Sequence, residues 1–369
     1  SEELREDFTA AERLMALNSP FMNFTIYVLF VFILYFGSYL IVSSQGTAFG
    51  VGQLSSLITY GFMMLMSLMM LSFVFAMIII AEEGARRICE VLLATSTINN
   101  PENPLTEVTD GSIDFENVGF SYSGPEGREA LSGVDLHINS GEVIGIIGGT
   151  GSAKSTLVQL IPRLYDVTAG SVSVGGHNVK DYDIDTLRGA VAMVLQKNVL
   201  FSGTIKENLL WGNPDATDEE ILEAARLAQA DSFVQTFPDK YETHIEQGGN
   251  NVSGGQKQRL CIARALLRRP KVLILDDSTS SGDTKTDSLI RSGLKDFLPD
   301  TTKIIIAQRT SSIEESDKII VLDNGRVNAI GTHEELLKDN PIYREVYFSQ
   351  NKQSVDENQS QEGEVTSHE

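Results

Sequence analysis

The chain has 369 residues, of which 42% are hydrophobic and 21% are charged, and this length predicts two or three domains. Acidic residues number 50 against 29 basic ones, and the formal net charge of -21 excludes a protein built mainly to coat nucleic acid. The two cysteines, Cys89 and Cys261, exclude a disulfide scaffold and a four-cysteine metal site. The charged opening is no signal peptide, and its first residue, Ser1, indicates a fragment or a processed chain.

An uncharged segment dominates the N-terminal part of the sequence. From Leu14 to Ala81 there is no Asp, Glu, Lys, Arg or His. Two apolar runs inside it, at about 20–42 and 54–80, predict helices about 34 and 40 Å long, enough to cross a hydrocarbon core of about 30 Å. Basic residues at both outer ends predict cytoplasmic flanks. We therefore expect a multi-pass protein in a lipid bilayer, with residues 1–95 as its transmembrane part. The alternative is a buried helical hairpin in a soluble protein.

The rest of the sequence divides into three parts. Residues 96–110 are rich in Pro and Asn and predict a linker. Residues 111–349 alternate short apolar runs with helical patterns, which is typical of an α/β domain. Residues 350–369 are polar and acidic without apolar periodicity and predict a disordered tail.

Continuous apolar runs in residues 111–349 predict a parallel sheet buried on both faces. They occupy residues 142–148, 190–195, 271–275, 303–307 and 318–322. The segment 112–123 alternates apolar and polar residues and predicts an antiparallel edge sheet. Because open α/β sheets bind ligands at the carboxyl ends of their strands, we expect chemistry at the residues that end four of these runs: Gly148, Gln196, Asp276 and Gln308.

A glycine-rich loop lies between the first apolar run and a helical pattern, which is the context of a phosphate-binding P-loop. Its backbone N–H groups and the following helix N-terminus would bind phosphates. Lys154 would add a charge near the β- and γ-phosphates, and Ser155 would hold Mg²⁺. A glycine-rich turn with a chance lysine is the alternative. The loop consists of Gly148, Gly149, Thr150, Gly151, Ser152, Ala153, Lys154, Ser155 and Thr156.

Two further features bear on this loop. Ala153 stands where the P-loop pattern has a glycine, and its Cβ costs about 1 kcal/mol or more if the backbone needs a positive φ. Asp276 and Asp277 follow an apolar run. A carboxylate at that place, opposite a P-loop, is a ligand on the Mg²⁺ side. The alternative role for this pair is helix capping.

The segment from Val252 to Leu266, VSGGQKQRLCIARAL, closely resembles the LSGGQ signature of ATP-binding cassette (ABC) proteins. The order of the other motifs over residues 111–349 matches the same family. The resemblance implies a P-loop NTPase cassette with a mixed α/β sheet core, an antiparallel β edge and a helical signature subdomain. The uncharged segment resembles the last two of six membrane helices in an exporter half-transporter, so about the first four would be missing from this chain.

The resemblance also implies roles by position. Tyr122 would stack on the adenine of ATP, with an ordinary strand aromatic as the alternative. Gln196 would contact Mg²⁺ beside Ser155 and Asp276. Such cassettes dimerise head to tail, so each nucleotide lies between one P-loop and the signature of the other subunit. The residues that would bind the γ-phosphate of the partner's nucleotide, at a helix N-terminus that attracts anions, are Ser253, Gly254, Gly255 and Gln256.

Departures from the family pattern fall on the site that uses this chain's own P-loop. Asp277 replaces a glutamate that polarises the attacking water, and a misplacement of about 1 Å can cost on the order of 100-fold in rate. Gln308 replaces a histidine, and its amide can hydrogen-bond a phosphate but carries no charge at pH 7. Together with Ala153, these residues predict tight binding of ATP with Mg²⁺ and poor hydrolysis. Gly282, where the family has leucine, is a further departure.

The signature, which serves the other site, is nearly intact, so the chain resembles the degenerate-site subunit of a heterodimeric multidrug-type exporter. The sequence therefore predicts ATP-driven export across the cell membrane, with a different half-transporter as partner and a cytoplasmic nucleotide-binding domain. Methionines at helical spacing within residues 54–80 suit a hydrophobic, drug- or lipid-like substrate, although ordinary helix packing also explains them. The alternatives are an ATP-sensing regulatory subunit without significant hydrolysis, a homodimer, and a soluble cassette protein acting on nucleic acid, which the uncharged segment opposes.

Overall fold

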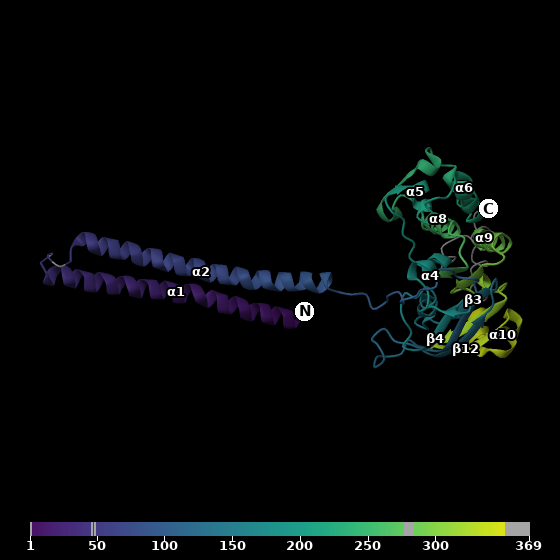
Figure 1. Cartoon of the computed structure of the whole chain (residues 1–369), viewed down its shortest axis with the longest axis horizontal. Coiled ribbons are helices and arrows are strands. Elements are labelled where there is room, and N and C mark those ends of the chain that lie inside the picture. Colours follow the sequence, from purple (N-terminus) through teal and green to yellow (C-terminus); the bar gives the residue numbers. More distant parts are fainter. Residues whose placement is uncertain (1, 46, 48, 277–283, 351–369) are drawn as a thin grey trace, which may run out of the picture. The chain divides into compact units, whose positions relative to one another are not determined.

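The computed structural model describes residues 2–45, 47, 49–276 and 284–350, and the chain divides into two units, Ser1–Ser96 and Thr97–Glu369. The first unit is a hairpin of two long helices, α1 (Glu2–Ser43) and α2 (Val51–Leu92), which run side by side (Figure 1). Its segments Pro20–Ser43 and Val51–Leu92 contain 18-residue windows with mean hydropathies of 2.2 and 2.6, and both segments are long and apolar enough to cross a membrane. They are candidate transmembrane helices. Both helices extend beyond the apolar runs of the sequence, because the flanking Glu, Arg, Ala and Leu residues favour helix.

Glycine allows the two helices of the first unit to approach each other. A Cβ on Gly37 would lie 2.3 Å from Cδ1 of Leu54, and one on Gly61 would lie 3.4 Å from Cδ1 of Ile33. Small residues permit such close approach in pairs of membrane helices. Large apolar side chains along both helices, such as Tyr39, are exposed in the single chain. An apolar surface of this extent requires a bilayer or further helices to cover it.

The centre of the second unit is a six-stranded sheet in the order β12–β11–β3–β10–β9–β6, parallel except for β12. All five apolar runs of the sequence form its parallel strands, and every residue of β9 and β10 is buried. This burial on both faces explains why the runs are continuous rather than alternating. The strands are β3 (Val143–Gly148), β6 (Val191–Val194), β9 (Val272–Asp276), β10 (Thr302–Ile306), β11 (Lys318–Asp323) and β12 (Arg326–Gly331).

A second sheet, antiparallel in the order β2–β1–β4–β5, contains the alternating segment of the sequence. Its strands are β1 (Ile113–Phe120), β2 (Leu131–Ile138), β4 (Ala169–Val174) and β5 (His177–Asn178). It shares one hydrophobic core with Ile304 and Ile306 of β10, whereas Ile305 between them belongs to a second core on the other side. The six-stranded sheet is therefore the middle layer. The antiparallel sheet, with α3 (Lys154–Gln159) and α4 (Ile184–Ala190), covers one face, and further helices cover the other.

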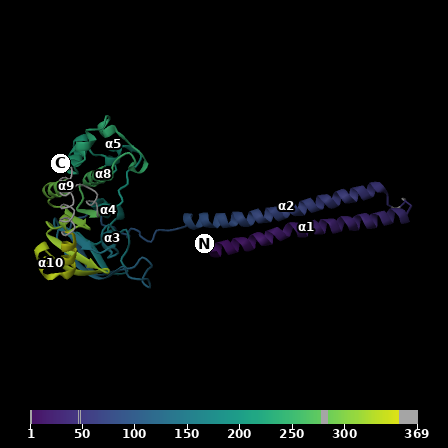
Figure 2. The same cartoon turned by 180° about the vertical axis from the view of Figure 1, so that it is seen from behind.

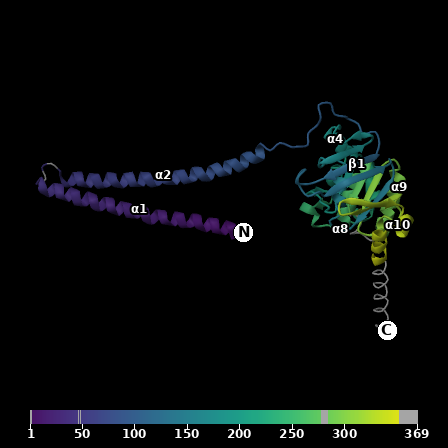
Figure 3. The same ribbon diagram turned by 90° about the horizontal axis from the view of Figure 1, so that it is seen from below.

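The helices of the second unit fall into two regions. Figures 1 and 2 show α5 and α8 grouped at the opposite end of this unit from α10. A short ribbon of β7 (Gly203–Thr204) and β8 (His244–Ile245) accompanies α5, and the chain after α10 forms a last described helix, residues 341–350, at the yellow end of the ribbon in Figure 3. The helices are α3 (Lys154–Gln159), α4 (Ile184–Ala190), α5 (Ile205–Leu210), α6 (Asp218–Leu227), α7 (Asp231–Val234), α8 (Gly254–Leu266), α9 (Thr284–Phe297) and α10 (His333–Asp339), with 3₁₀ turns at Lys240–Glu242, Gln247–Gly249 and Thr310–Ser312.

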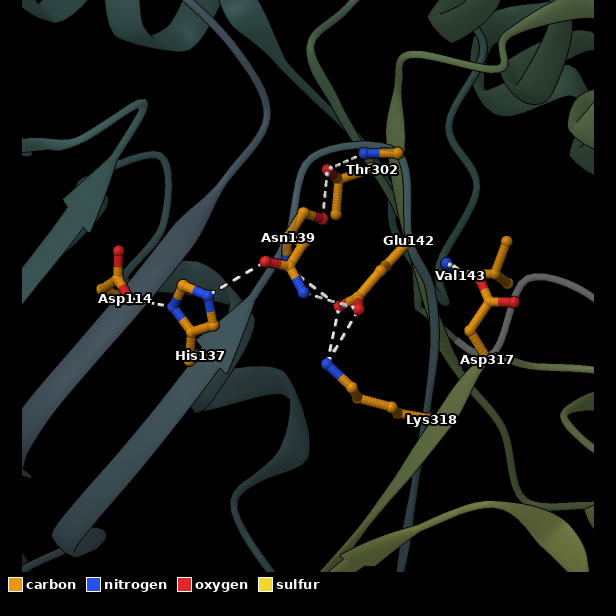
Figure 4. A network of polar contacts seen from close by, with 9 residues as sticks. Asp114, His137, Asn139, Glu142, Val143, Thr302, Asp317 and Lys318 are labelled. Atoms are coloured by element: carbon orange, nitrogen blue, oxygen red, sulfur yellow. Dashed lines mark hydrogen bonds and ion pairs between the residues drawn. The ribbon is translucent and has the colours of Figure 1, made fainter.

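A polar network connects the two sheets near the amino ends of β3 and β11 (Figure 4). The His137 ring bonds Asp114 and, through Nε2, Oδ1 of Asn139 at 3.1 Å. Asn139 Nδ2 donates to Glu142 at 2.8 Å, and Lys318 Nζ donates to the same carboxylate at 2.8 Å. The hydrogen bond to Asp114 raises the pKa of His137. Burial opposes ionisation of Glu142, but the bonds from Lys318 and Asn139 outweigh it and lower its pKa.

Candidate functional site

The carboxyl ends of the parallel strands meet at one edge of the six-stranded sheet. The register pairs Ile306 with Asp276 across β10 and β9, and Leu322 with Gly148 across β11 and β3. Gln308 follows β10 by two residues, and Gln196 follows β6 by two residues. Both glutamine side chains are exposed, whereas Asp276 is 7% exposed. The fold therefore brings these four chain segments together at this edge.

The loop between β3 and α3 has a backbone that depends on glycine at particular positions. A Cβ on Gly148 would lie 2.2 Å from the carbonyl oxygen of Leu322, so only glycine lets the end of β3 pass so close to β11. Gly151 has φ 82°, and a Cβ there would meet no atom within 4 Å. Ala153 also adopts the left-handed conformation, with φ 71° and ψ 25°, immediately before α3. Its Cβ therefore carries the conformational cost that the sequence predicts for a positive φ.

Lys154 folds back over this loop. Its Nζ donates to the carbonyl oxygens of Gly148 at 2.8 Å and Gly149 at 2.9 Å, and it lies 3.4 Å from Ser152 Oγ. These acceptors hold the ammonium above the glycine backbone at the start of α3. A phosphate that enters the loop can replace them, because a charged pair forms a stronger hydrogen bond than a neutral carbonyl does. Ser155, the next residue, is exposed.

A cleft of about 770 Å³ opens over the loop. Tyr122 lines it and is 56% exposed. The Tyr122 hydroxyl lies 2.9 Å from Oγ1 of Thr156, and its ring contacts Phe120 and Tyr165 edge to face, with centroids 4.8 and 5.2 Å apart. These contacts fix the ring beside the loop, where a flat apolar group can stack on it. The other lining residues are Ser123, Arg128, Glu129, Ala130, Gly151, Ser152, Ala153, Lys154, Ser155, Thr156, Asn324 and Gly325.

Six of these lining residues were not expected from the sequence: Ser123, Arg128, Glu129, Ala130, Asn324 and Gly325. They come from the β1–β2 connection and from the β11–β12 turn. The register that pairs Leu322 with Gly148 brings that turn beside the loop. The Asn-Gly pair predicts a turn, but no local pattern indicates which strand lies next to β3.

The oxygen donors proposed for a metal come from three different elements. They are the Ser155 hydroxyl, the Gln196 amide oxygen and the Asp276 carboxylate, and oxygen donors of this kind fit Mg²⁺, which also takes water and phosphate oxygens as ligands. Within the described ranges, no group of three or more His, Cys, Asp and Glu residues could hold a metal by itself. Asp277, predicted to be catalytic, and Gly282 lie outside the described residues.

The signature segment forms the start of α8. Ser253 is its N-cap, and its Oγ accepts from the N–H of Gln256 at 3.3 Å while Gln256 Oε1 accepts from the N–H of Ser253 at 2.9 Å. This capping box leaves the Ser253 hydroxyl proton as a donor. A Cβ on Gly254 would meet nothing within 4 Å. In the described part of the chain, Ser253, Gly254, Gly255 and Gln256 do not line the cleft over the P-loop.

A second cavity, of about 300 Å³, lies beside the segment that carries Gln196. Phe201 and Trp211 stack on its wall with ring centroids 4.8 Å apart, and Arg264 lies 6.0 Å from the centre of the Phe201 ring. Cys261 also lines the cavity, and burial raises the pKa of its thiol. The thiol therefore stays protonated at neutral pH, which makes it a poor nucleophile.

Residues 131–280 match the family model described as ABC transporter. The second unit contains an ABC transporter ATP-binding domain. A solved structure of a bacterial Atm1-family ABC exporter with ATP bound is similar over 89% of this chain and 57% of that chain, with a TM-score of 0.70 and 31% sequence identity. This similarity confirms the mixed α/β cassette fold, preceded by two candidate transmembrane helices.

Relatives with this ABC domain include an uncharacterized ABC transporter ATP-binding protein of Mycobacterium tuberculosis. It is 41% identical over 340 residues, which cover 91% of this chain and 57% of the relative. A putative multidrug export ATP-binding/permease protein of Staphylococcus aureus is 44% identical over 245 residues, which cover 66% of this chain and 42% of that protein. The chain thus spans about half the length of these relatives.

Proposed function

We propose that this chain is part of an ABC exporter in the cell membrane that uses ATP to move a substrate outward. The observation that carries the proposal is the presence, in one chain, of a glycine loop with Lys154 above it and two candidate transmembrane helices. The similarity to a multidrug export protein and to an ATP-bound exporter supports the same function. In this proposal, the ATP-binding domain lies on the cytoplasmic side and works as one of two domains in a dimer.

ATP and Mg²⁺ are the ligands we assign to the cleft over the P-loop. The Tyr122 ring would stack on adenine, and Lys154 would exchange its carbonyl acceptors for phosphate oxygens. The oxygen ligands of Mg²⁺ would come from Ser155, Gln196 and Asp276. When bound, the ion would offset the negative charge of the phosphates. The backbone of residues 148–156 would surround the phosphates, as in other P-loops.

Hydrolysis at this chain's own P-loop is, in this proposal, impaired. Asp277 is one methylene shorter than the glutamate of the family pattern, which would displace its carboxylate from the attacking water by about 1 Å. Gln308 lies at the same sheet edge as the loop and offers a neutral amide to a terminal phosphate. ATP would therefore bind at this site and remain largely intact.

The signature of this chain would complete the site of a second subunit. The capping box fixes the Ser253 hydroxyl at the start of α8, where it can donate to a phosphate together with the N–H groups of the helix N-terminus. The departures from the family pattern fall on the site of this chain's own P-loop, whereas the signature is nearly intact. We therefore infer that the partner is a different half-transporter whose own P-loop site hydrolyses ATP. Methionines at helical spacing within residues 54–80 suit a hydrophobic, drug- or lipid-like substrate.

ATP turnover of the chain alone and of the assembled dimer tests this function. We expect the lone chain to bind ATP but to turn it over slowly, and the double variant Asp277→Glu with Gln308→His to raise turnover in the dimer. Fast turnover by the unmodified lone chain, abolished by Lys154→Ala, would contradict the impaired site. Dimer turnover that transported substrates do not stimulate would favour the alternative, an ATP-sensing regulatory subunit.

A further inference from the structure

The side chain of Gln350 hydrogen-bonds the backbone at both ends of the short segment that follows β10. Its Nε2 donates to the carbonyl oxygen of Gln308 at 2.7 Å. Its Oε1 accepts from the Thr310 N–H at 2.9 Å and from the Thr310 hydroxyl at 3.2 Å. One carboxamide from the end of the described chain thus binds a carbonyl and an amide that lie two residues apart.

The segment between these hydrogen bonds, residues 308–309, forms an exposed bridge between two buried residues. Gln308 and Arg309 are exposed, whereas Ala307 before them and Thr310 after them are buried. Thr310 is also the first residue of the 3₁₀ turn Thr310–Ser312, and the first N–H groups of a helix have no acceptor within the helix. Gln350 supplies that acceptor, so the hydrogen bonds define where the bridge ends.

Gln350 acts from a firmly packed helix. Within residues 341–350, Tyr343 is fully buried, and Ile342 and Val346 pack against the core that includes Ile305 of β10. The Tyr343 hydroxyl lies 2.7 Å from Nδ1 of His333 in α10. The amide of Gln350 is therefore presented by a rigid support rather than by a loose chain end.

We propose that Gln350 is a positioning residue for Gln308. By clamping the backbone on both sides of Arg309, it fixes the place from which the Gln308 side chain meets the terminal phosphate of ATP. This inference rests on the proposed function, in which Gln308 contacts that phosphate. Because ADP lacks the terminal phosphate, the clamp affects the binding of a triphosphate and leaves the binding of ADP unchanged.

Equilibrium binding of two nucleotides to the full chain tests the proposal. The probes are the non-hydrolysable analogue adenylyl imidodiphosphate and ADP, each with Mg²⁺. We expect Gln350→Ala to lower the preference for the triphosphate by about threefold to tenfold, the usual range for one net hydrogen bond, with no change for ADP. In a Gln308→Ala background, Gln350→Ala should cause no further loss, because residues that act through each other are not additive. Ser349→Ala, at the exposed neighbouring position, is the matched control and should change nothing.

Two results would overturn the role of Gln350. The first is an equal loss for both nucleotides, or a loss that persists in the Gln308→Ala background, since either indicates a general structural effect. The second is an unchanged preference in Gln308→Ala itself. Failure of the unmodified chain to bind either nucleotide would overturn the proposed function and the inference with it. If Gln350→Ala does not fold, Gln350→Asn replaces it, because its shorter side chain keeps the amide but withdraws it from both partners.

Discussion

The substitutions Ala153→Gly and Gly151→Ala test whether backbone conformation in the P-loop, rather than side-chain contact, determines how these positions affect the free energy of unfolding. Ala153 has φ 71° and Gly151 has φ 82°, so both lie in the left-handed region. A Cβ in that region costs roughly 1–2 kcal/mol. Ala153→Gly removes this cost, and Gly151→Ala adds it at a position where the new Cβ would meet no atom within 4 Å. The two substitutions therefore change the same quantity, the cost of a Cβ at positive φ, in opposite directions.

The expected magnitudes differ because the two positions differ in packing. Glycine has more conformational freedom than alanine in the unfolded chain, which favours unfolding by about 0.5–1 kcal/mol wherever glycine is present. In both substitutions this effect opposes the change in backbone strain. Ala153 is half-buried and packs against the core between the two sheets, so Ala153→Gly also loses some apolar contact. We expect Ala153→Gly to change the free energy of unfolding by about 0.5 kcal/mol or less, towards greater stability. Gly151→Ala should lower that free energy by about 1 kcal/mol.

Thermal unfolding followed by tryptophan fluorescence measures both changes. Trp211, the single tryptophan of the chain, lies in the ATP-binding unit and stacks on Phe201, so its emission reports the unfolding of that unit. We expect Gly151→Ala to lower Tm by about 2 °C and Ala153→Gly to leave it unchanged or slightly raised. A clear loss of stability in Ala153→Gly, with none in Gly151→Ala, would refute the reasoning from φ.

Three further predictions concern single side chains. Lys154→Ala should weaken ATP binding by about 10- to 100-fold, measured by calorimetry, because a charge-assisted hydrogen bond to phosphate is lost; unchanged affinity would contradict the assigned cleft. Gly148→Ala should lower Tm more than Gly151→Ala does, because its Cβ would lie 2.2 Å from the Leu322 carbonyl oxygen. His137 has a raised pKa, so its pairing with Asp114 should stabilise the fold below about pH 6.5 and be lost as pH rises through the raised pKa. Asp114→Asn should flatten that part of the Tm profile, and an unaltered profile would count against the pairing.

The sequence predicts the sheet well because its signals are local. Residues 271–275 and 303–307 are short, continuous apolar runs, which fit strands buried on both faces of a sheet. Glycine at 148 and the lysine at 154 likewise follow from a short motif. Ala153 adopts the left-handed conformation in which its Cβ is expected to carry a cost. In each case, neighbours along the chain carry the information.

The walls of the site depend on contacts between distant segments, and these are not visible in the sequence. Asn324 lines the cleft only because β11 pairs with β3, and no local pattern specifies that neighbour. Gln350 is predicted as the first residue of a disordered tail, but it lies in the helix described over residues 341–350 and binds residues 40 and 42 positions earlier. Periodicity indicates a helix or its absence. It does not indicate which distant backbone groups a side chain such as that of Gln350 will bind.

The most direct test of the central claim compares two variants of this chain in the assembled dimer, with ATP turnover as the measurement. In the proposal, Lys154→Ala disables this chain's own P-loop, and Ser253→Ala removes the hydroxyl that would serve the partner's site. Thr217→Ala is the matched control, because Thr217 caps α6 with the same capping box away from the signature. The proposal predicts that Ser253→Ala lowers turnover strongly, while Lys154→Ala and Thr217→Ala leave most of it. The reverse order, with Lys154→Ala abolishing turnover and Ser253→Ala leaving it intact, would contradict the claim.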